Sequence, residues 1–366
     1  MGKEITSYVG QKVRAVKFLQ GAKGAACLEG DECAVPLLVA GGYDSSDTAI
    51  SLLFPQMPTA DHMDLADEFG NEASTEIVEL CSLEHAGDVT SLGFLSLANN
   101  DFVVSGSSNG SLYVSSIIKS DASLALKSVA IPQWEHLSLG SLAGIDVDSP
   151  SASIVAACES GQVVWANLDR PRSVLVLDLD EWATHDVKML GIETHIALAC
   201  ANPRQPLQLW DLKASHDKPV STSGAAGSAY TCLAAHPTRP ELLLAGTKDG
   251  SLTLWDRRFL GNGALRTECR HKKAVRSVKW HDAKPGFVFT ASDDHTVLSW
   301  DFYAGNGSPS SDKVDYERHS RDGGVTVTTV ANGILPWNTL DVDGVSDTLI
   351  AGSDNHSVVL VDCATS

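Results

Sequence analysis

The sequence predicts an all-β fold, a propeller of seven four-stranded blades, and three observations support this prediction. Three short runs of alternating apolar and polar residues end in a Trp-Asp pair, and a turn-forming cluster such as Asp249-Gly250-Ser251 precedes each run. Successive pairs are 45 residues apart, at Trp210-Asp211, Trp255-Asp256 and Trp300-Asp301. A repeat of about 40–45 residues with these features is typical of one propeller blade.

Radial stacking follows from the two faces of each predicted blade. A twisted sheet of four short strands has two apolar faces and cannot bury both by itself. In a ring, each blade covers one face of the next. Trp165 continues the 45-residue period, although Ala166 occupies the position of the Asp. We therefore assign residues 1–366 to one seven-bladed ring.

The first two blades lack a Trp-Asp pair and are placed by alternation and turn residues. Asn109-Gly110 is a strong hairpin turn, because both residues tolerate positive φ. The predicted strands of these two blades are Lys12–Leu19, Pro36–Tyr43, Thr48–Phe54 and Thr75–Leu83, then Val89–Leu95, Asp101–Ser107, Ser111–Ile117 and Leu126–Ile131.

The next four blades follow the Trp period. They span Leu142–Asp180, Val187–Gly224, Tyr230–Cys269 and a segment that begins at Val275 and reaches Asp301. Two long insertions interrupt the pattern, at about 55–74 in blade 1 and at 303–336, which we place between blades 6 and 7. Inside the second insertion, Gly324–Val330 has the alternation of an outer strand.

The last predicted blade is one strand short. It holds Asn338–Val342, Thr348–Gly352 and Ser357–Val361. Near the other end of the chain, Glu4–Val9 is a strand candidate with no partner close in sequence. We expect this N-terminal strand to complete the last blade, because the pairing closes the ring and removes an exposed sheet edge.

These repeats resemble the WD-repeat family, in which a chain of Ser or Thr, His and Asp holds the buried Trp of the third strand. A buried indole N–H needs an acceptor. In the sixth repeat the resemblance implies a network of Trp300, Thr290 or Ser292, His271 and Asp294. In the fifth, no His occupies the expected place. The structural residues that we single out are Trp165, Trp210, Asp211, Asp249, Trp255, Asp256, His271, Asp294, Trp300 and Asp301.

The charge of the chain excludes several classes of partner. Acidic residues number 46 against 27 Lys and Arg, which gives a net charge of −19. Nucleic acids and anionic membrane surfaces need a basic footprint, so we expect no direct nucleic-acid binding. No apolar run approaches the ~18 residues of a membrane span, and we expect no membrane insertion. The eight scattered cysteines form no Cys-x-x-Cys pair and indicate buried, reduced thiols.

No residue pattern indicates catalysis, a cofactor or a metal. The sequence lacks Gly-x-Ser-x-Gly, a phosphate-binding Gly-rich loop and His-Glu-x-x-His. His236 and His281 occupy corresponding places after inner strands, and we interpret them as turn histidines. We therefore predict a protein that is not an enzyme and has no cofactor or metal site. An enzyme with its site at the central channel is the remaining hypothesis of that class.

Two sets of residues are candidates for partner binding. In the first insertion, Met63, Leu65 and Phe69 alternate with acidic residues, which fits a binding loop, an amphipathic helix or a solvated excursion. Positive charge gathers between blades 5 and 6, where it could receive an acidic partner segment or balance the protein's own acids. This basic cluster comprises Arg266, Arg270, Lys272, Lys273, Arg276 and Lys279.

A third candidate is the box Trp255-Asp256-Arg257-Arg258. It resembles the Trp-Asp-x-Arg box of propellers that serve as substrate receptors of cullin-type ubiquitin ligases. The resemblance implies a receptor with Arg258 at the adaptor contact, and this is our alternative function. Boxes of this length also occur in propellers with other roles.

A closer resemblance runs through the chain in blade order. Short segments are similar to WD-repeat nucleoporins on the short arm of the Y-shaped nuclear pore scaffold. This implies a non-catalytic scaffold subunit at the nuclear envelope, monomeric on its own, that binds α-solenoid nucleoporins and supports protein and mRNA transport. Neither insertion follows the resemblance. The similar segments are Tyr8–Val13, His85–Val89, Phe289–Asp294, Ser299–Asp301 and Asn338–Val342.

Overall fold

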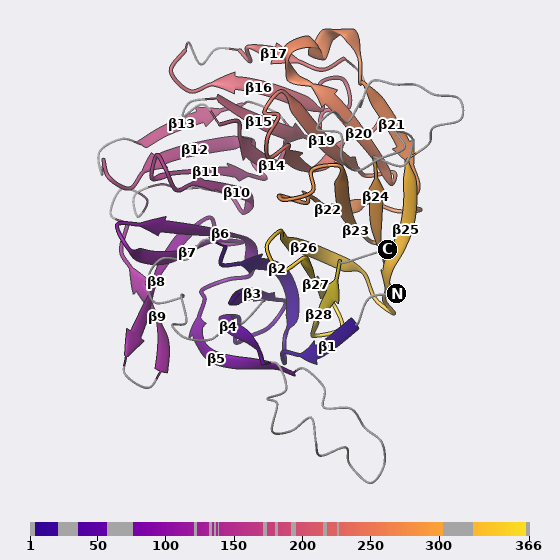
Figure 1. The fold of residues 1–366 in the computed structure, drawn as a ribbon. Coiled ribbons are helices and arrows are strands. Elements are labelled where there is room, and N and C mark those ends of the chain that lie inside the picture. The colour runs from indigo at the N-terminus through magenta and orange to yellow at the C-terminus, as the bar shows by residue number, and fades with distance from the viewer. Residues whose placement is uncertain are drawn as a thin grey trace.

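The strands of the chain form seven four-stranded sheets around a common centre (Figure 1). The structure is a computed structural model, and it describes residues 4–20, 36–56, 76–120, 123–131, 134, 137, 139–170, 174–179, 182–191, 195–214, 218–224, 227–302 and 325–363. Each sheet is one blade, and its first strand faces the centre of the ring. The predicted all-β, seven-bladed propeller is confirmed.

Blades 1 to 4 follow one another along the chain. Their strands, from the centre outward, are β2 (Lys12–Phe18), β3 (Leu38–Tyr43), β4 (Ala49–Gln56) and β5 (Glu76–Glu84); β6 (Val89–Leu97), β7 (Asn100–Ser107), β8 (Leu112–Ser120) and β9 (Ser123–Val129); β10 (Leu142–Asp148), β11 (Ser153–Cys158), β12 (Gln162–Asn167) and β13 (Val174–Asp178); and β14 (Thr184–Met189), β15 (His195–Cys200), β16 (Leu207–Asp211) and β17 (Ser221–Thr222).

Blades 5 to 7 complete the ring. Their strands are β18 (Tyr230–Ala235), β19 (Leu242–Thr247), β20 (Ser251–Asp256) and β21 (Arg266–Cys269); β22 (Val275–Trp280), β23 (Phe287–Ser292), β24 (Thr296–Asp301) and β25 (Thr326–Asn332); and β26 (Trp337–Asp343), β27 (Thr348–Ser353), β28 (Ser357–Asp362) and β1 (Glu4–Tyr8). One 3₁₀ helix, η1 (Arg257–Asn262), follows β20.

The N-terminal strand closes the ring, as the sequence predicts. β1 pairs antiparallel with β28, from Glu4 opposite Val361 to Tyr8 opposite Ser357, and lies beside it in Figure 1. The N–H of Val9 continues the ladder to the carbonyl of His356 at 2.9 Å. Because β28 would otherwise be a bare outer edge, this pairing joins the first and last parts of the chain into one sheet.

Two strands begin three residues earlier than predicted. β9 begins at Ser123 rather than Leu126, because Ser120 pairs with Ser123, and β14 begins at Thr184 rather than Val187.

The predicted outer strand Gly324–Val330 corresponds to β25 (Thr326–Asn332), which pairs with β24 and completes blade 6. The second insertion therefore falls between two strands of blade 6 and not between blades 6 and 7. Residues 57–75 and 303–324 of the two insertions lie outside the described residues.

The antiparallel order gives the ring two faces. We call upper the face where the second strand of a blade turns into the third and where the fourth strand leads to the next blade. The lower face carries the turns between first and second strands and between third and fourth strands. η1 follows the third strand of blade 5 and therefore lies on the lower face.

Every inner strand has a register shift at its upper end. The shift skips one residue, which is the mark of a β-bulge and leaves that residue outside the ladder. In the seven blades the skipped residues are Arg14, Thr90, Ala143, His185, Thr231, Arg276 and Asn338. All seven line the upper part of the central channel. We call them the bulge ring.

Side chains of the bulge ring bond to the next blade. His185 Nδ1 of blade 4 donates to the carbonyl of Tyr230 in blade 5 at 2.6 Å. Thr231 Oγ1 donates to the carbonyl of Val275 in blade 6. Each acceptor directly precedes the bulged residue of its own blade. The bulge therefore places a polar side chain where it satisfies the neighbouring inner edge.

Carboxylates lower in the channel bond to N–H groups of the next blade. Asp146 accepts from the N–H of Met189 at 2.8 Å, and Asp186 accepts from that of Leu233 at 2.8 Å. Asp341 accepts from the N–H of Phe18 at 2.9 Å. Each of the three aspartates precedes a Val on its inner strand. The repeated Asp-Val pair is a sequence signal for this bond between blades, and the sequence analysis did not use it.

Asp341 also binds two lysines in neighbouring blades. Its carboxylate lies 3.4 Å from Lys17 Nζ in blade 1 and 3.1 Å from Lys279 Nζ in blade 6. Burial opposes ionisation of Asp341, but the two ammonium groups and the N–H of Phe18 lower its pKa. For Lys279, burial opposes the charge, but Asp341 and Asp282 raise its pKa. One carboxylate thus connects blades 6, 7 and 1.

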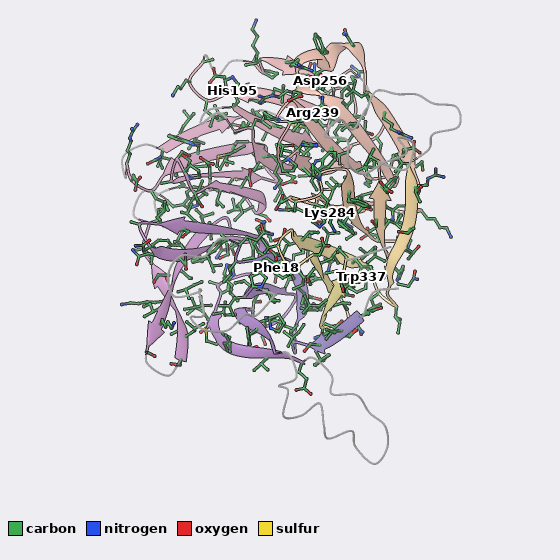
Figure 2. The ribbon with its side chains drawn as sticks, viewed as in Figure 1. Phe18, His195, Arg239, Asp256, Lys284 and Trp337 are labelled. Atoms are coloured by element: carbon green, nitrogen blue, oxygen red, sulfur yellow. The ribbon has the colours of Figure 1, made fainter. Side chains whose placement is uncertain are left out.

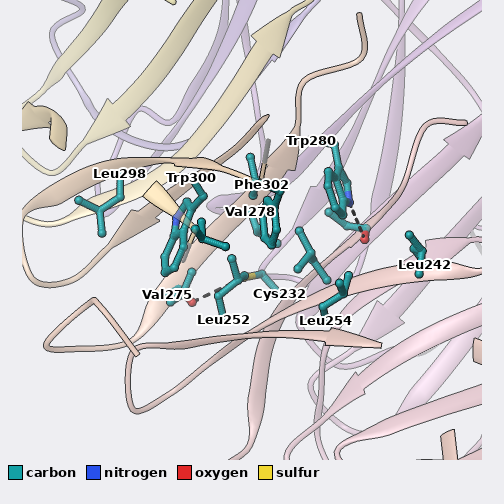
Figure 3. Packing of buried hydrophobic residues seen from close by; sticks show 14 residues of the cluster. Cys232, Leu242, Leu252, Leu254, Val275, Val278, Trp280, Leu298, Trp300 and Phe302 are labelled. Atoms are coloured by element: carbon teal, nitrogen blue, oxygen red, sulfur yellow. Dashed lines mark hydrogen bonds between the residues drawn. The ribbon is translucent and has the colours of Figure 1, made fainter. Parts of the chain in front are cut away.

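Apolar side chains fill the space between blades. Figure 3 shows the cluster of blades 5 and 6, in which Leu242 and Leu254 of one blade pack with Val278 of the other. Trp280 and Trp300 are fully buried in it, with 1% and 0% of their surface exposed. The Trp280 indole donates to the carbonyl of Ala234 in blade 5 at 3.4 Å. Each blade therefore buries its neighbour's face, as the repeat predicts.

Deleting residues 1–10 should destabilise the whole ring. The deletion removes the β1 ladder, and lost hydrogen bonds of about 1 kcal/mol each make a loss of about 3 kcal/mol or more. Thermal unfolding followed by circular dichroism measures it. Tyr8→Ser, at a side chain that is 72% exposed, is the control and should change little. An unchanged Tm after the deletion would contradict the closure.

Asp341→Asn should lower the free energy of unfolding by about 2–3 kcal/mol. The amide still accepts from Phe18, but two ammonium groups lose their counter-ion. This loss of stability is smaller than that for a fully buried ion pair, because the side chains of Lys17 and Lys279 remain 29% and 25% exposed. Asp44→Asn breaks an exposed ion pair with Lys12 and should cost less than ~1 kcal/mol. Equal urea midpoints for the two variants would show that Asp341 holds no blades together.

Candidate functional site

The seven inner strands enclose a central channel. It encloses about 1020 Å³ and is lined by all seven inner strands. Its lining contains eight Lys and Arg side chains against six carboxylates. The chain as a whole carries −19. The channel is therefore slightly positive inside a strongly acidic protein.

Most channel charges are paired, but the pairs are not spread evenly. Lys17, Lys188 and Lys279 contact carboxylates of inner strands in the lower part. At the upper mouth, Arg276 makes a bidentate contact with Asp293. Its Nε and Nη2 atoms donate to the two carboxylate oxygens, each at 2.7 Å. Arg14 lies over the ring of Tyr43, 5.8 Å from its centre. The lower channel is thus an internal ion-pair layer, and the mouth is more open to solvent.

The Trp-associated network of blade 6 forms through Thr290. Trp300 Nε1 donates to Thr290 Oγ1 at 2.8 Å, His271 Nε2 lies 2.7 Å from the same hydroxyl, and His271 Nδ1 lies 3.0 Å from Asp294. Ser292, the other candidate, instead accepts from the N–H of Asp294. The network joins the core to the upper turns.

The charges of this network are set by burial and hydrogen bonds. Burial lowers the pKa of His271, although the nearby Asp294 carboxylate acts to raise it. Burial opposes the charge of Asp294, but donors from Thr296, Lys272 N–H and His271 lower its pKa to about 2. Near neutral pH, His271 is therefore uncharged and Asp294 is a carboxylate. The pair works as a structural hydrogen bond.

The other tryptophans use different acceptors. Trp255 Nε1 donates to the hydroxyl of Tyr230 at 2.9 Å, which replaces the missing histidine of the fifth repeat. Trp210 Nε1 donates to Gln208 at 3.0 Å on its own strand. Trp165 is partly exposed, and its buried Nε1 atom has no hydrogen-bond partner among the described residues. The sequence analysis missed Tyr230 because it lies at the start of an inner strand, far from the motif.

The singled-out aspartates hold turns and strand ends. Asp211 accepts from the N–H of Lys213 at 2.9 Å, and Asp249 accepts from the hydroxyl of Thr247. Asp301 ends β24 and pairs with Phe287 and Thr326. Asp211 and Asp249 therefore hold turns with their side chains, and Asp301 takes part in the backbone pairing of blade 6.

Asp256 and Arg258 of the Trp-Asp-x-Arg box bond to each other. Arg258 Nε lies 2.9 Å from Asp256 Oδ1, and a second nitrogen lies 2.5 Å from Oδ2. The N–H of Arg258 bonds to the same carboxylate, so that Asp256 caps η1. Asp256 is buried and labelled in Figure 2, while the Arg258 side chain is 55% exposed. The box therefore presents an arginine that is already neutralised on the lower face.

The predicted basic cluster divides into paired and unpaired members. Arg266 and Arg270 contact Glu268, at 2.9 and 3.6 Å. Lys272 and Lys273 are exposed, and neither ammonium group contacts a carboxylate in the described part of the chain. The sequence analysis missed a third such residue, Lys248, in the neighbouring turn. Its signal was the turn Lys248-Asp249-Gly250, which was used only to place strands.

The remaining predicted residues are placed as follows. His236 and His281 are buried turn histidines, whose Nδ1 atoms accept from the N–H groups of Arg239 and Lys284. Met63, Leu65 and Phe69 lie outside the described residues. Among described residues, no group of three His, Cys, Asp or Glu is placed to hold a metal ion. In the same part of the chain, no helix has the length and apolarity to cross a membrane.

The repeats match a known family. The WD40 model, described as WD domain, G-beta repeat, matches residues 217–256 and 263–301. Each match begins at the outer strand of one blade and ends with the Trp-Asp strand of the next. The sequence repeat is therefore one strand out of step with the blade. That offset is why an N-terminal strand completes the last blade.

Two curated nucleoporins are similar over most of the chain. Nucleoporin Nup43 of Mus musculus is 24% identical over 271 residues, which cover 71% of this chain and 67% of that protein. Nucleoporin Nup43 of Homo sapiens gives the same values. DNA damage-binding protein 2 of Oryza sativa subsp. japonica is 37% identical over 78 residues, which cover 21% of this chain and 13% of that protein. The chain is a WD-repeat β-propeller protein similar to nucleoporin Nup43.

Proposed function

We propose that the protein is a structural scaffold subunit of the nuclear pore complex. Its partners would be α-solenoid scaffold nucleoporins of the Y-shaped complex, bound at the nuclear envelope in support of protein and mRNA transport. The observation that carries this proposal is the similarity to nucleoporin Nup43 over 71% of the chain. A match of that extent involves most of the ring, whereas a shared repeat would match locally.

The chemistry of the channel supports a binding role rather than a catalytic one. Its carboxylates and lysines bond across blades, so their charges stabilise the closed ring. The comparisons indicate a non-enzymatic scaffold family. We infer that this chain is not an enzyme, needs no cofactor and is monomeric until it meets its partner. A closed ring offers large outer surfaces that need not deform on binding.

Tagged protein expressed in the source cells should recover scaffold nucleoporins in near-equal amounts. Quantitative mass spectrometry of the purified material measures the ratio, and immunofluorescence should show a nuclear rim. An unrelated WD-repeat propeller with the same tag is the control. Recovery of nucleoporins only in trace amounts, equal to the control, would refute the proposal.

A second candidate function rests on the exposed Arg258. The lower-face box is geometrically available to an adaptor, because more than half of the arginine side chain faces solvent. Binding would require the adaptor to compete with Asp256 for the guanidinium, or to contact its outer edge. In this function the protein would be a substrate receptor of a cullin-type ubiquitin ligase.

Arg258→Ala separates the two functions. If the box binds a ligase adaptor, the variant should lose that adaptor and keep its fold, with at most ~1 kcal/mol lost because the ion pair is partly exposed. Co-precipitation with the adaptor and thermal unfolding measure the two effects. Arg257→Ala, in the same box, is the matched control. Absence of any adaptor with the unaltered chain would end this candidate.

A further inference from the structure

Four connections lie next to one another on the upper face of blades 5 to 7. They are the β19–β20 turn, the β21–β22 loop, the β23–β24 turn and the β25–β26 loop. Gly250 packs so closely that an added Cβ would lie 2.4 Å from the carbonyl oxygen of His271, so its turn abuts the next loop. That loop bonds to the following turn, because the Lys272 N–H donates to Asp294 at 2.8 Å. The last contact joins His295 Nδ1 to the carbonyl of Ile334 at 2.8 Å. The connections therefore form one continuous surface.

This surface combines basic and aliphatic side chains. Lys248, Lys272 and Lys273 are exposed and line the mouth of the channel. Ile334 is 85% exposed and Leu335 is 38% exposed at the other end of the same surface. We call these five residues the upper patch. Exposed apolar residues rimmed by polar side chains often mark protein-binding sites.

Three acidic residues in the turns beside the upper patch already make polar contacts of their own. Asp294 accepts from Thr296, His271 and the Lys272 N–H. Asp293 binds Arg276, and Asp249 binds the Thr247 hydroxyl. None of the three lysine ammonium groups contacts a carboxylate among the described residues, although the protein carries −19 overall. Acids elsewhere are screened beyond about 8 Å at physiological ionic strength.

We propose that the upper patch binds an acidic segment of a partner protein that also carries an aliphatic residue. Carboxylates of the segment would contact the three lysines, and its aliphatic side chain would pack on Ile334 and Leu335. Charge complementarity selects the acidic segment, and the exposed aliphatic pair selects a peptide over a polyanion without apolar groups. The proposal deepens the proposed scaffold function, because it names one surface by which the propeller takes a partner.

The test measures binding of a fluorescent peptide of alternating Glu and Leu to the purified full chain by anisotropy. Lys272→Glu with Lys273→Glu should weaken binding at least about tenfold, and Ile334→Ser should weaken it about three- to tenfold. Added salt should weaken binding to the unaltered chain. The control, Lys119→Glu with Lys127→Glu on the outer hairpin of blade 2, changes the net charge equally and should bind normally. Thermal unfolding checks that each variant is folded.

Several results would overturn the proposal. No measurable binding to the unaltered chain, or equal weakening by the control variant, would exclude a specific site. A peptide of Glu and Ser that binds as tightly as the Leu peptide, with no effect of Ile334→Ser, would show a general polyanion site instead. Self-association that is lost in the lysine variant would assign the surface to a second copy. Peptide binding without recovery of nucleoporins would refute the nuclear-pore function alone, and the reverse would refute only the patch.

Discussion

The fold depends on satisfying the inner edges of seven strands that have no ladder partner toward the channel. Backbone N–H and C=O groups left unpaired on these strands would be costly wherever neighbouring blades shield them from water. The chain meets this constraint with side chains of adjacent blades. Asn338 of the bulge ring reaches the carbonyl of Val13, and Asp341 reaches the N–H of Phe18. Both bonds cross the junction between blades 7 and 1, where β1 also closes the outer edge.

This constraint determines where function can lie. Lower channel residues such as Lys17 and Asp186 bond across blades, so that a ligand there would compete with contacts that hold the ring closed. Burial raises the pKa of Asp186 and lowers that of Lys17, which shows the cost of these charges. The upper turns also bond to one another, but the ammonium groups of Lys248, Lys272 and Lys273 contact no carboxylate among the described residues. Three lysines without an ion-pair partner in the described structure therefore lie on the upper face of an otherwise acidic protein.

The repeat period and the closure could be predicted from sequence, because a Trp every 45 residues and a missing last strand leave few arrangements. The network of His271 and Asp294 was implied by the resemblance to WD-repeat proteins, and the structure contains it. Tyr230 could not be predicted, because a hydroxyl from another strand replaces the histidine and only the fold brings them together. The start of β25 was visible as alternation, but its blade depends on pairing with β24. Contacts between distant segments decide these details.

The two candidate contacts lie on opposite faces, and this favours different roles for them. Arg258 is already paired with Asp256, so a partner that contacts Arg258 gains only the binding free energy beyond that of the existing ion pair. Lys272 and Lys273 need not break an internal bond before they meet an acidic segment. In our proposal the upper face would therefore bind its partner at a lower energetic cost, and the lower face would remain accessible to a second protein. A ring that holds one partner on each face would connect them without changing shape, which is what an assembly scaffold requires.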